Sequence, residues 1–479
     1  MLFNSPEFLL FLPIVFGLYW FVVQRNLKAQ NALLLVASYV FYGWWDWRFL
    51  GLIAFSTVVD FLVGLRIAEA DEKRTKKAWL WVSLAVNLGL LGYFKYSNFF
   101  IESWVDAWAT AGVTMHVSSL KVILPVGISF YTFQTLSYSI DIYRGQIKPT
   151  RNFINFAAFV SFFPQLVAGP IERASRLLPQ IEKPRVFTYE QGVSGLRLIL
   201  WGMFKKVVVA DTCAIYANDI FANYTDYSGP TLMLGAVYFA FQIYGDFSGY
   251  SDIAIGTARL FGIKLMTNFK MPYFSRDIAE FWRRWHISLS TWFRDYLYIP
   301  LGGSRGGKWK SVRNVFIIFL VSGFWHGANW TFVVWGGIHA TLFLPLLLTG
   351  KNRKHTTDTV AEGRWLPTGR EFLGMAWTFT MVCMAWVFFR ADSISDASDY
   401  IVRVCDFRAW LEKPELLSMT AFVYLGVLIF GDWLVRSGTM PRLWAHERFT
   451  LVRWGCYAVG MFFILKNFHS QVDFIYFQF

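Results

Sequence analysis

The sequence has few charged residues and few of the residues that build metal, redox or nucleotide sites. Only 16% of its 479 residues are Asp, Glu, Lys or Arg, well below the roughly 25% that is usual for a soluble domain. Its four cysteines, at positions 213, 383, 405 and 456, have neither zinc-site spacing nor the density of a disulfide framework. A P-loop, a dinucleotide-binding glycine fingerprint and a fixed-period repeat are also missing. We therefore expect no metal centre, no redox site and no bound cofactor.

The chain also lacks a polar stretch long enough to fold as a soluble domain, and apolar sequence takes its place. Hydrophobic residues make up 55% of it and aromatic residues 20%, with a mean hydropathy of +0.39. A transmembrane helix needs about 20 mainly apolar residues, so we predict an all-α polytopic membrane protein with ten to thirteen spanning or re-entrant helices. The predicted spans are 8–23, 31–45, 49–67, 79–94, 121–140, 153–170, 193–210, 231–246, 314–348 (one long helix or two short ones), 372–389, 419–435 and 450–465.

The formal charge of +13 does not indicate nucleic-acid binding, because the basic residues lie between the predicted spans. Clusters follow the first, third and fifth spans, at 25–28, 73–77 and 144–151. This positive-inside pattern places alternate loops in the cytoplasm and the N-terminus outside. The first span has no positive n-region and no A-x-A cleavage pattern, so we expect it to be retained. We predict one membrane-embedded domain over 1–479, with the catalytic core at about 120–348, peripheral helices at 1–119 and 372–479, and a flexible loop at 351–370.

The segment 276–310, which reads RDIAEFWRRWHISLSTWFRDYLYIPLGGSRGGKWK, differs from a membrane span. Its Trp and other apolar residues recur at steps of three and four, which predicts an amphipathic helix that ends at Pro300. Arg283 and Arg294 fall on the opposite side of this helix, as in helices that lie at a membrane interface or pack against a bundle. His286 falls at the edge of the apolar stripe, beside Phe293. The pattern therefore points His286 toward the protein interior.

The motif FWHGANW at 324–330 places His326 inside a long apolar run. Ionisable side chains in a membrane segment are costly and tend to line a bundle interior or a water-filled cavity. Gly323 and Gly327 thin the helix around the imidazole, and Trp325 and Trp330 supply apolar walls. Asn329 can hydrogen-bond across a helix pair or to the neighbours of His326, and so orient it. The same residues also fit a plain small-residue helix interface with an orienting amide. Glycine spacing alone leaves both interpretations open.

The chemistry that suits such a histidine is proton transfer, because the ordinary pKa of imidazole lies near working pH. The chain has no G-x-S-x-G nucleophile motif and no cysteine near His326 in the sequence. A serine or cysteine acyl-enzyme is therefore poorly supported. The remaining option is a general base that deprotonates a substrate hydroxyl, which then attacks an activated acyl group.

The motifs together resemble the membrane-bound O-acyltransferase (MBOAT) family, in its alginate O-acetyltransferase branch. The resemblance covers nearly the whole chain. It rests on FWRRWHISLSTWFRDYLYIPLGG, GFWHGANWTFVVWGGIHA, SFYTFQTLSYSIDIYRG at 129–145, FFPQLVAGPIERASRLLPQ at 162–180, YGDFSGYSDIAIG at 244–256 and WVFFRADS at 386–393.

The resemblance implies a ring of helices around a tunnel, with His326 as the catalytic histidine. His286, 40 residues earlier, matches a second family position, and His339 matches a histidine of this branch with a weaker claim to chemistry. It further implies acetyl-CoA as a cytoplasmic acyl-donor substrate and a polysaccharide hydroxyl as acceptor on the far side. The expected setting is a bacterial inner membrane, with an extracytoplasmic or membrane-anchored acetylesterase-like partner protein that completes the transfer.

Two further groups of residues have open interpretations. Asp246 and Asp252 lie among glycines and serines that suggest a helix break at the tunnel, and the carboxylates fit either a tunnel function or pairing with a basic residue. The second group is basic and fits either the phosphates of coenzyme A or anionic lipid headgroups. It consists of Arg283, Arg284, Arg294 and Lys308.

The acceptor is the least determined part of the prediction. Alginate is one candidate, and peptidoglycan, cellulose or another envelope glycan are alternatives. A secondary transporter or flippase is a remote alternative of another class, since intramembrane histidine and aspartate also occur there. A transporter would move its solute without cleaving acyl-CoA, so thioester cleavage separates the two classes.

Overall fold

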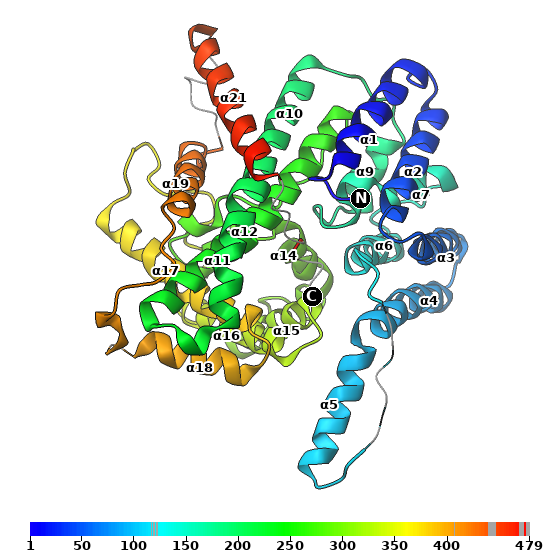
Figure 1. Ribbon diagram of the computed structural model, residues 1–479. Helices are drawn as coiled ribbons and strands as arrows, with labels where there is room; N and C mark the ends of the chain where they lie inside the picture. Colours follow the sequence, from blue (N-terminus) through cyan, green and yellow to red (C-terminus); the bar gives the residue numbers. More distant parts are fainter. Residues whose placement is uncertain are drawn as a thin grey trace. The chain divides into compact units, whose positions relative to one another are not determined.

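The computed structural model describes residues 1–115, 117, 120, 123–406, 408–438, 447–468 and 474–475. Over these residues the chain is helical and contains no strand (Figure 1), which confirms the predicted all-α class. The described chain forms two compact units. The first comprises Met1–Ile199 and Ile253–Met266, and the second comprises Leu200–Asp252 and Thr267–Phe479.

The first unit is built from the N-terminal helices. Their bounds are α1 Pro6–Gly17, the π-helix η1 Leu18–Val22, α2 Leu27–Gly43, η2 Trp47–Phe49, α3 Leu50–Glu69, α4 Lys73–Leu91, η3 Gly92–Tyr96, α5 Ser97–Thr110, α6 Ile128–Tyr143, α7 Phe153–Ser161, α8 Phe163–Leu166, α9 Ala174–Ile181 and most of α10 Tyr189–Met203.

A buried carboxylate joins α3, α4 and α6, which pack against one another. Asp60 of α3 is fully buried and accepts hydrogen bonds from Ser83 Oγ at 2.5 Å, Asn87 Nδ2 at 2.8 Å and Ser139 Oγ at 3.1 Å. In a membrane bundle such polar contacts add to packing in holding helices together, because lipid cannot hydrogen-bond these groups. These hydrogen bonds therefore link three helices in the core of the first unit.

The second unit contains the histidine motifs. Its helices are the π-helix η4 Phe204–Ala210, α11 Asp211–Ala222, η5 Tyr224–Asp226, α12 Gly229–Leu260 as far as Asp252, η6 Pro272–Phe274, α13 Ile278–Arg284, α14 Ile287–Phe293, the π-helix η7 Arg294–Tyr298, α15 Lys308–His326, α16 Trp330–Leu348, η8 Lys351–Arg353, α17 Gly369–Arg390, α18 Ile394–Cys405, η9 Ala409–Leu411, α19 Met419–Leu434, η10 Glu447–Phe449 and α21 Thr450–Asn467.

Most predicted spans coincide with helices, and the differences are local. The apolar run 314–348 forms two helices, α15 and α16, whereas 153–170 is divided between α7 and α8. The predicted span 121–140 becomes helical only at Ile128, and positions 121 and 122 lie outside the described residues. Helix α5 was not predicted, because Glu102 and Asp106 interrupt its apolar character.

The predicted break around Asp246 and Asp252 is wrong, because α12 is continuous through both residues. The glycines that suggested a break allow close packing instead. A Cβ added at Gly245 would lie 2.8 Å from the Lys205 carbonyl oxygen, and one at Gly249 would lie 2.7 Å from that of Gly202. Glycine here lets one helix backbone approach another.

Four helical segments within the described residues are each long and apolar enough to cross a membrane. They are Trp47–Glu69, Lys73–Thr110, Trp330–Leu348 and Gly369–Arg390, and Pro6–Val22 and Met419–Leu434 are shorter apolar helices. The total of ten to thirteen crossings stays a prediction.

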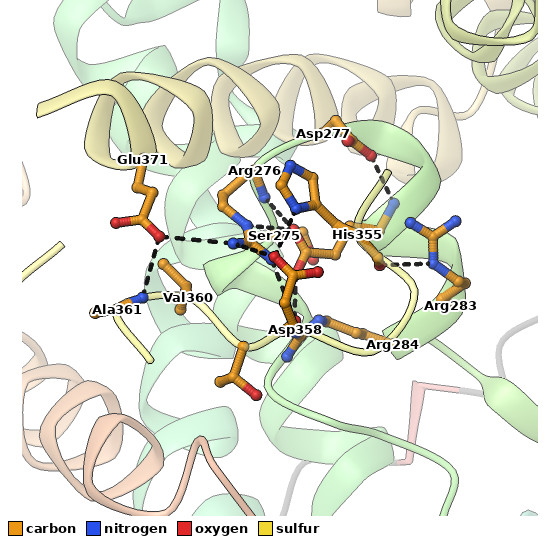
Figure 2. A network of polar contacts seen from close by, with 12 residues as sticks. Ser275, Arg276, Asp277, Arg283, Arg284, His355, Asp358, Val360, Ala361 and Glu371 are labelled. Carbon is orange, nitrogen blue, oxygen red and sulfur yellow. Dashed lines mark hydrogen bonds and ion pairs between the residues drawn. The ribbon is translucent and has the colours of Figure 1, made fainter. Parts of the chain in front are cut away.

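The segment 351–370, predicted as a flexible loop, is anchored by the polar network of Figure 2. Asp358 forms an ion pair with Arg276 at 2.9 Å and accepts a hydrogen bond from His355 Nδ1 at 2.9 Å. Ala361 is fully buried, and its N–H donates to Glu371 at 3.2 Å. Composition alone does not reveal these contacts, because the partner of Asp358, Arg276, comes 82 residues earlier in the chain.

Candidate active site

His326 is the last residue of α15, where that helix meets α16. The two helices approach closely at glycines: a Cβ at Gly323 would lie 2.2 Å from the Phe332 carbonyl oxygen, and one at Gly336 would lie 2.2 Å from that of Phe319. The small-residue interface suggested by the sequence is therefore present, and it brings a buried imidazole to the end of a helix. Only 4% of His326 is exposed.

Aromatic rings surround the His326 imidazole. The ring centroids of Trp325, Trp335 and Phe389 lie 4.9, 5.2 and 5.4 Å from that of His326. Trp325 thus forms a wall, as predicted, whereas Trp330, the other predicted wall, is 54% exposed. Trp335 and Phe389 form two further walls that the motif did not reveal. The imidazole sits in an enclosure that is apolar on several sides.

The structure corrects the continuous amphipathic helix that was predicted from position 276 to Pro300. Helix α13 ends at Arg284, His286 has left-handed backbone angles (φ 43, ψ 55), and α14 begins at Ile287. The break is stabilised by Asn268, whose backbone oxygen accepts from the Ile287 N–H at 2.9 Å and whose Oδ1 accepts from the Ser288 N–H at 3.2 Å. These N–H groups open α14 and need partners outside the helix.

The break brings the two histidines together. His286 is fully buried, and its ring centroid lies 6.3 Å from that of His326. Phe247 of α12 packs edge-on against His286 at 4.7 Å, and Trp325 lies 6.0 Å away. His286 therefore faces His326 from the start of α14, not from the side of a continuous helix beside Phe293.

His339 lies on α16, one aromatic ring further from the pair. It is fully buried, its Nδ1 accepts a hydrogen bond from Trp282 Nε1 at 3.3 Å, and Trp335 contacts both His339 at 4.9 Å and His326 at 5.2 Å. Trp335 thus lies between the two histidines, so that His339 belongs to the wall of the enclosure.

Asn329 caps the helix that follows His326. Its Oδ1 accepts from the Thr331 N–H at 3.0 Å, and its Nδ2 donates to the Asp392 carbonyl at 3.1 Å. The first contact gives a backbone N–H at the start of α16 a hydrogen-bond partner, and the second joins this helix to the residues that follow α17. The predicted orienting role toward His326 stays a prediction, because both contacts are to the backbone of other residues.

Asp246 and Asp252 pair with lysines of the π-helix η4. Lys206 lies 2.8 Å from Asp246 and 2.9 Å from Asp211, and Lys205 lies 2.5 Å from Asp252. The two lysines were not singled out from the sequence, although two adjacent lysines in an apolar run were a usable signal. Structural pairing is the interpretation that these contacts favour for both carboxylates.

The basic candidates for phosphate binding separate into two pairs. Arg283 donates to the carbonyl oxygens of His355 and Asn352 at 3.2 and 2.9 Å, and Arg284 pairs with Glu280 at 2.8 Å, so both serve the network of Figure 2. Arg294 is exposed and pairs with the adjacent Asp295 at 2.7 Å, and Lys308 is exposed at the start of α15. Binding of coenzyme A phosphates stays a prediction for all four.

An apolar cavity of about 270 Å³ lies near His286, within the second unit. Its lining includes Phe241 and Tyr244 of α12, Tyr273 of η6 and Asp432 of α19. Tyr244 and Tyr273 contact Trp285, the residue before His286, at 6.3 and 6.0 Å between ring centroids. Trp285 therefore packs against two of the side chains that line this cavity.

Comparison with known proteins gives both a family and close relatives. A sequence model of the MBOAT, membrane-bound O-acyltransferase family matches residues 144–388. The probable alginate O-acetylase AlgI of Pseudomonas syringae pv. tomato is 42% identical over 474 residues, covering 98% of this chain and 83% of the relative. The probable alginate O-acetylase AlgI of Pseudomonas aeruginosa is 40% identical over 473 residues, with 98% and 83% covered. The peptidoglycan O-acetyltransferase of Helicobacter pylori is 37% identical over 427 residues, with 83% and 78% covered.

Proposed function

The chain belongs to the membrane-bound O-acyltransferase family, and we propose that it moves an acetyl group from cytoplasmic acetyl-CoA across the membrane to an extracytoplasmic polysaccharide such as alginate. Its membership makes it a multi-pass membrane protein and an O-acyltransferase. The observation that carries the reaction is the buried pair His286 and His326, whose rings lie 6.3 Å apart among aromatic side chains. The similarity of nearly the whole chain to proteins named alginate O-acetylase supports the choice of acceptor.

The proposed chemistry is a direct acyl transfer between two bound substrates. His326 takes the proton of the acceptor hydroxyl, the hydroxyl oxygen attacks the acetyl carbonyl, and an ester C–O bond forms. The C–S bond of the thioester breaks, and the departing thiolate takes up a proton to become free coenzyme A. His286 orients or polarises the thioester or its leaving group. The aromatic enclosure keeps water from competing for the acetyl group.

The setting of the reaction belongs to the same proposal. We place the protein in a bacterial inner membrane with its N-terminus outside the cytoplasm, because the basic clusters at 25–28, 73–77 and 144–151 alternate as the positive-inside rule requires. An extracytoplasmic or membrane-anchored acetylesterase-like partner completes transfer to the polymer. Peptidoglycan is the second candidate acceptor, since a relative of that name is 37% identical over 427 residues.

The test of the proposal uses His326→Ala and His326→Gln in membranes supplied with labelled acetyl-CoA and acceptor. We expect both variants to lose thioester cleavage and acceptor acetylation by about 100-fold or more, the effect of removing a general base. His355→Gln is the matched control, because His355 lies in the anchored segment 351–370 and contacts Asp358. Unchanged turnover in His326→Gln would remove the proposed role, and solute movement without acyl-CoA cleavage in the unmodified protein would indicate a transporter.

A further inference from the structure

Asn268 is a buried polar residue that links three parts of the second unit. It lies in the extended segment between α12 and η6, and it is fully buried. Its side-chain oxygen Oδ1 lies 3.1 Å from His286 Nδ1, 3.2 Å from the Ser288 backbone N and 2.9 Å from Ser288 Oγ. Its Nδ2 donates to Ser251 Oγ of α12 at 3.2 Å. The amide thus connects α12 and the start of α14 to one nitrogen of His286.

The orientation of the Asn268 amide follows from its neighbours. A backbone N–H can only donate, so the Asn268 atom that faces the Ser288 N–H must be the oxygen. The opposite orientation would place the NH₂ group against that N–H and leave a buried donor without an acceptor, at a cost of about 1–3 kcal/mol. The hydroxyl of Ser251, by contrast, can accept from the NH₂ group. Oxygen therefore faces His286 Nδ1.

The protonation of the His286 imidazole follows from this orientation. The side-chain oxygen of asparagine is an acceptor, so Nδ1 of His286 must carry the hydrogen. A neutral imidazole carries one ring hydrogen, and the hydrogen bond at one nitrogen decides which nitrogen has it. Nε2 is then the nitrogen with the lone pair. His339 has the opposite arrangement, because its Nδ1 accepts from Trp282 Nε1 at 3.3 Å, which leaves the hydrogen on Nε2.

We infer that Asn268 is a positioning residue that holds neutral His286 with its hydrogen on Nδ1, so that His286 meets the substrates as a hydrogen-bond acceptor through Nε2. This inference rests on the proposed function and makes the role of His286 more specific. Polarising a thioester carbonyl requires an N–H donor, which this tautomer does not offer at Nε2. His286 instead holds an N–H or O–H group of a substrate. Two groups have this chemistry: the amide N–H next to the thioethyl end of coenzyme A, and a second hydroxyl of the acceptor, since the hydrogen of the reacting hydroxyl goes to His326.

The kinetic test compares Asn268→Leu with Asn268→Asp. Leucine fills a similar volume without an acceptor, whereas aspartate keeps an oxygen for both His286 Nδ1 and the Ser288 N–H. We expect kcat/KM for acetyl transfer to fall about 10- to 100-fold in Asn268→Leu, the usual effect of removing a partner that orients a functional histidine. We expect Asn268→Asp to restore most of it. Thr291→Val is the matched control, because it removes a hydroxyl of the same helix, α14, that donates to the Ile287 and Ser288 carbonyl oxygens, at 2.8 and 3.0 Å. Equal kcat/KM in Asn268→Leu and the unmodified protein would overturn the inference.

The spectroscopic test reads the tautomer directly and needs no activity. Protein labelled with ¹⁵N in its histidine rings is studied by solid-state NMR in membranes, and the His286 signals are identified as those lost in His286→Gln. We expect a protonated Nδ1 and an unprotonated Nε2 for His286, and the reverse for His339, which serves as an internal reference. An Nε2–H signal from His286 would overturn the inference. If the tautomer is as expected but acetyl-CoA is not cleaved by the unmodified protein, the proposed function fails and the positioning role of Asn268 stands.

A donor analogue distinguishes the two substrate groups. In this analogue an ester replaces the amide next to the thioethyl end of coenzyme A, which removes the N–H and keeps the thioester. If His286 holds that amide, we expect the analogue to have about a tenfold higher KM with the unmodified protein and no further penalty in Asn268→Leu. If the analogue is used as well as acetyl-CoA while Asn268→Leu stays slow, a second hydroxyl of the acceptor is the group that His286 holds. Equal use of both donors together with full activity of Asn268→Leu would contradict both assignments.

Discussion

The close contact between α15 and α16 leaves no space for a side chain at Gly336, so we expect substitution of this glycine to be costly. A Cβ there would lie 2.2 Å from the Phe319 carbonyl oxygen and 2.9 Å from its carbonyl carbon, against 3.4 Å for ordinary contact. Both neighbours are backbone atoms of α15, so no side chain can rotate away. Gly336→Ala therefore requires the two helices to separate by about 1 Å, a form of overpacking that typically costs about 1–3 kcal/mol.

The separation also moves the candidate catalytic histidine. His326 ends α15, and Trp335, which packs on it at 5.2 Å, belongs to α16 beside the substituted position. A misplacement of about 1 Å can cost about 100-fold in rate. We therefore expect Gly336→Ala to lower kcat/KM about 100-fold and to lower the melting temperature of the solubilised protein.

Gly337→Ala is the matched control, one residue further along the same helix. Its Cβ would meet only Leu320 Cδ2, at 3.8 Å. Both substitutions gain the same roughly 1 kcal/mol of helix propensity, so the difference between them isolates the contact with α15. The assays are cleavage of labelled acetyl-CoA in membranes and thermal unfolding in detergent. If Gly336→Ala and Gly337→Ala have the same turnover and the same melting temperature, the argument from close packing is refuted.

Two further predictions concern charged groups. We expect Lys206→Met to destabilise the protein by about 3–5 kcal/mol, because it leaves buried carboxylates without their cation. The loss is measured as a lower melting temperature, and adding Asp246→Asn should recover part of it. An unchanged melting temperature in Lys206→Met would contradict the pairing. Burial raises the pKa of Asp358, but the hydrogen bond from His355 and a nearby arginine charge outweigh it, so the pKa lies below its ordinary value of 3.8. The anchoring of 351–370 by Asp358 is therefore present above pH 3.8 and lost as the pH falls below it. Hydrogen exchange of this segment, corrected for intrinsic rates, should show protection falling below that pH in the unmodified protein but not in Asp358→Asn; equal protection at pH 6 and pH 3 would contradict it.

The sequence predicted the helices and the two central histidines, because both signals are local. Apolar runs of span length mark α16 and α17, and an imidazole in such a run at His326 is costly enough to stand out. The break at His286 was missed for a physical reason. The apolar period continues across it, whereas the backbone is held by Asn268, which precedes it by 18 residues and pairs with it in space. Periodicity reports which face of a helix is buried and does not report where a distant amide ends the helix.

The lysines of η4 were missed for a related reason. The run FKKVVVA was counted as part of a span, in which lysines are expected near the ends, where they extend to the membrane interface. In the structure Lys205 and Lys206 are 3% and 6% exposed, and their carboxylate partners on α12 lie about 40 residues later in the chain. A cluster of opposite charges from two apolar helices is visible only once the helices are paired.

The two histidines occupy matching positions, each at a helix break that an asparagine closes. His286 precedes α14, whose first N–H groups are satisfied by Asn268, and His326 ends α15 just before Asn329 caps α16. In a membrane protein, backbone outside regular helix is tolerated where it is buried in protein or lines a cavity. The asparagines supply the required hydrogen bonds at both breaks. The imidazoles are thereby placed at the ends of helices, where the backbone leaves the helical path. A histidine in the middle of either helix would be packed by its own helix on both sides, so the breaks are as necessary to the proposed chemistry as the imidazoles themselves.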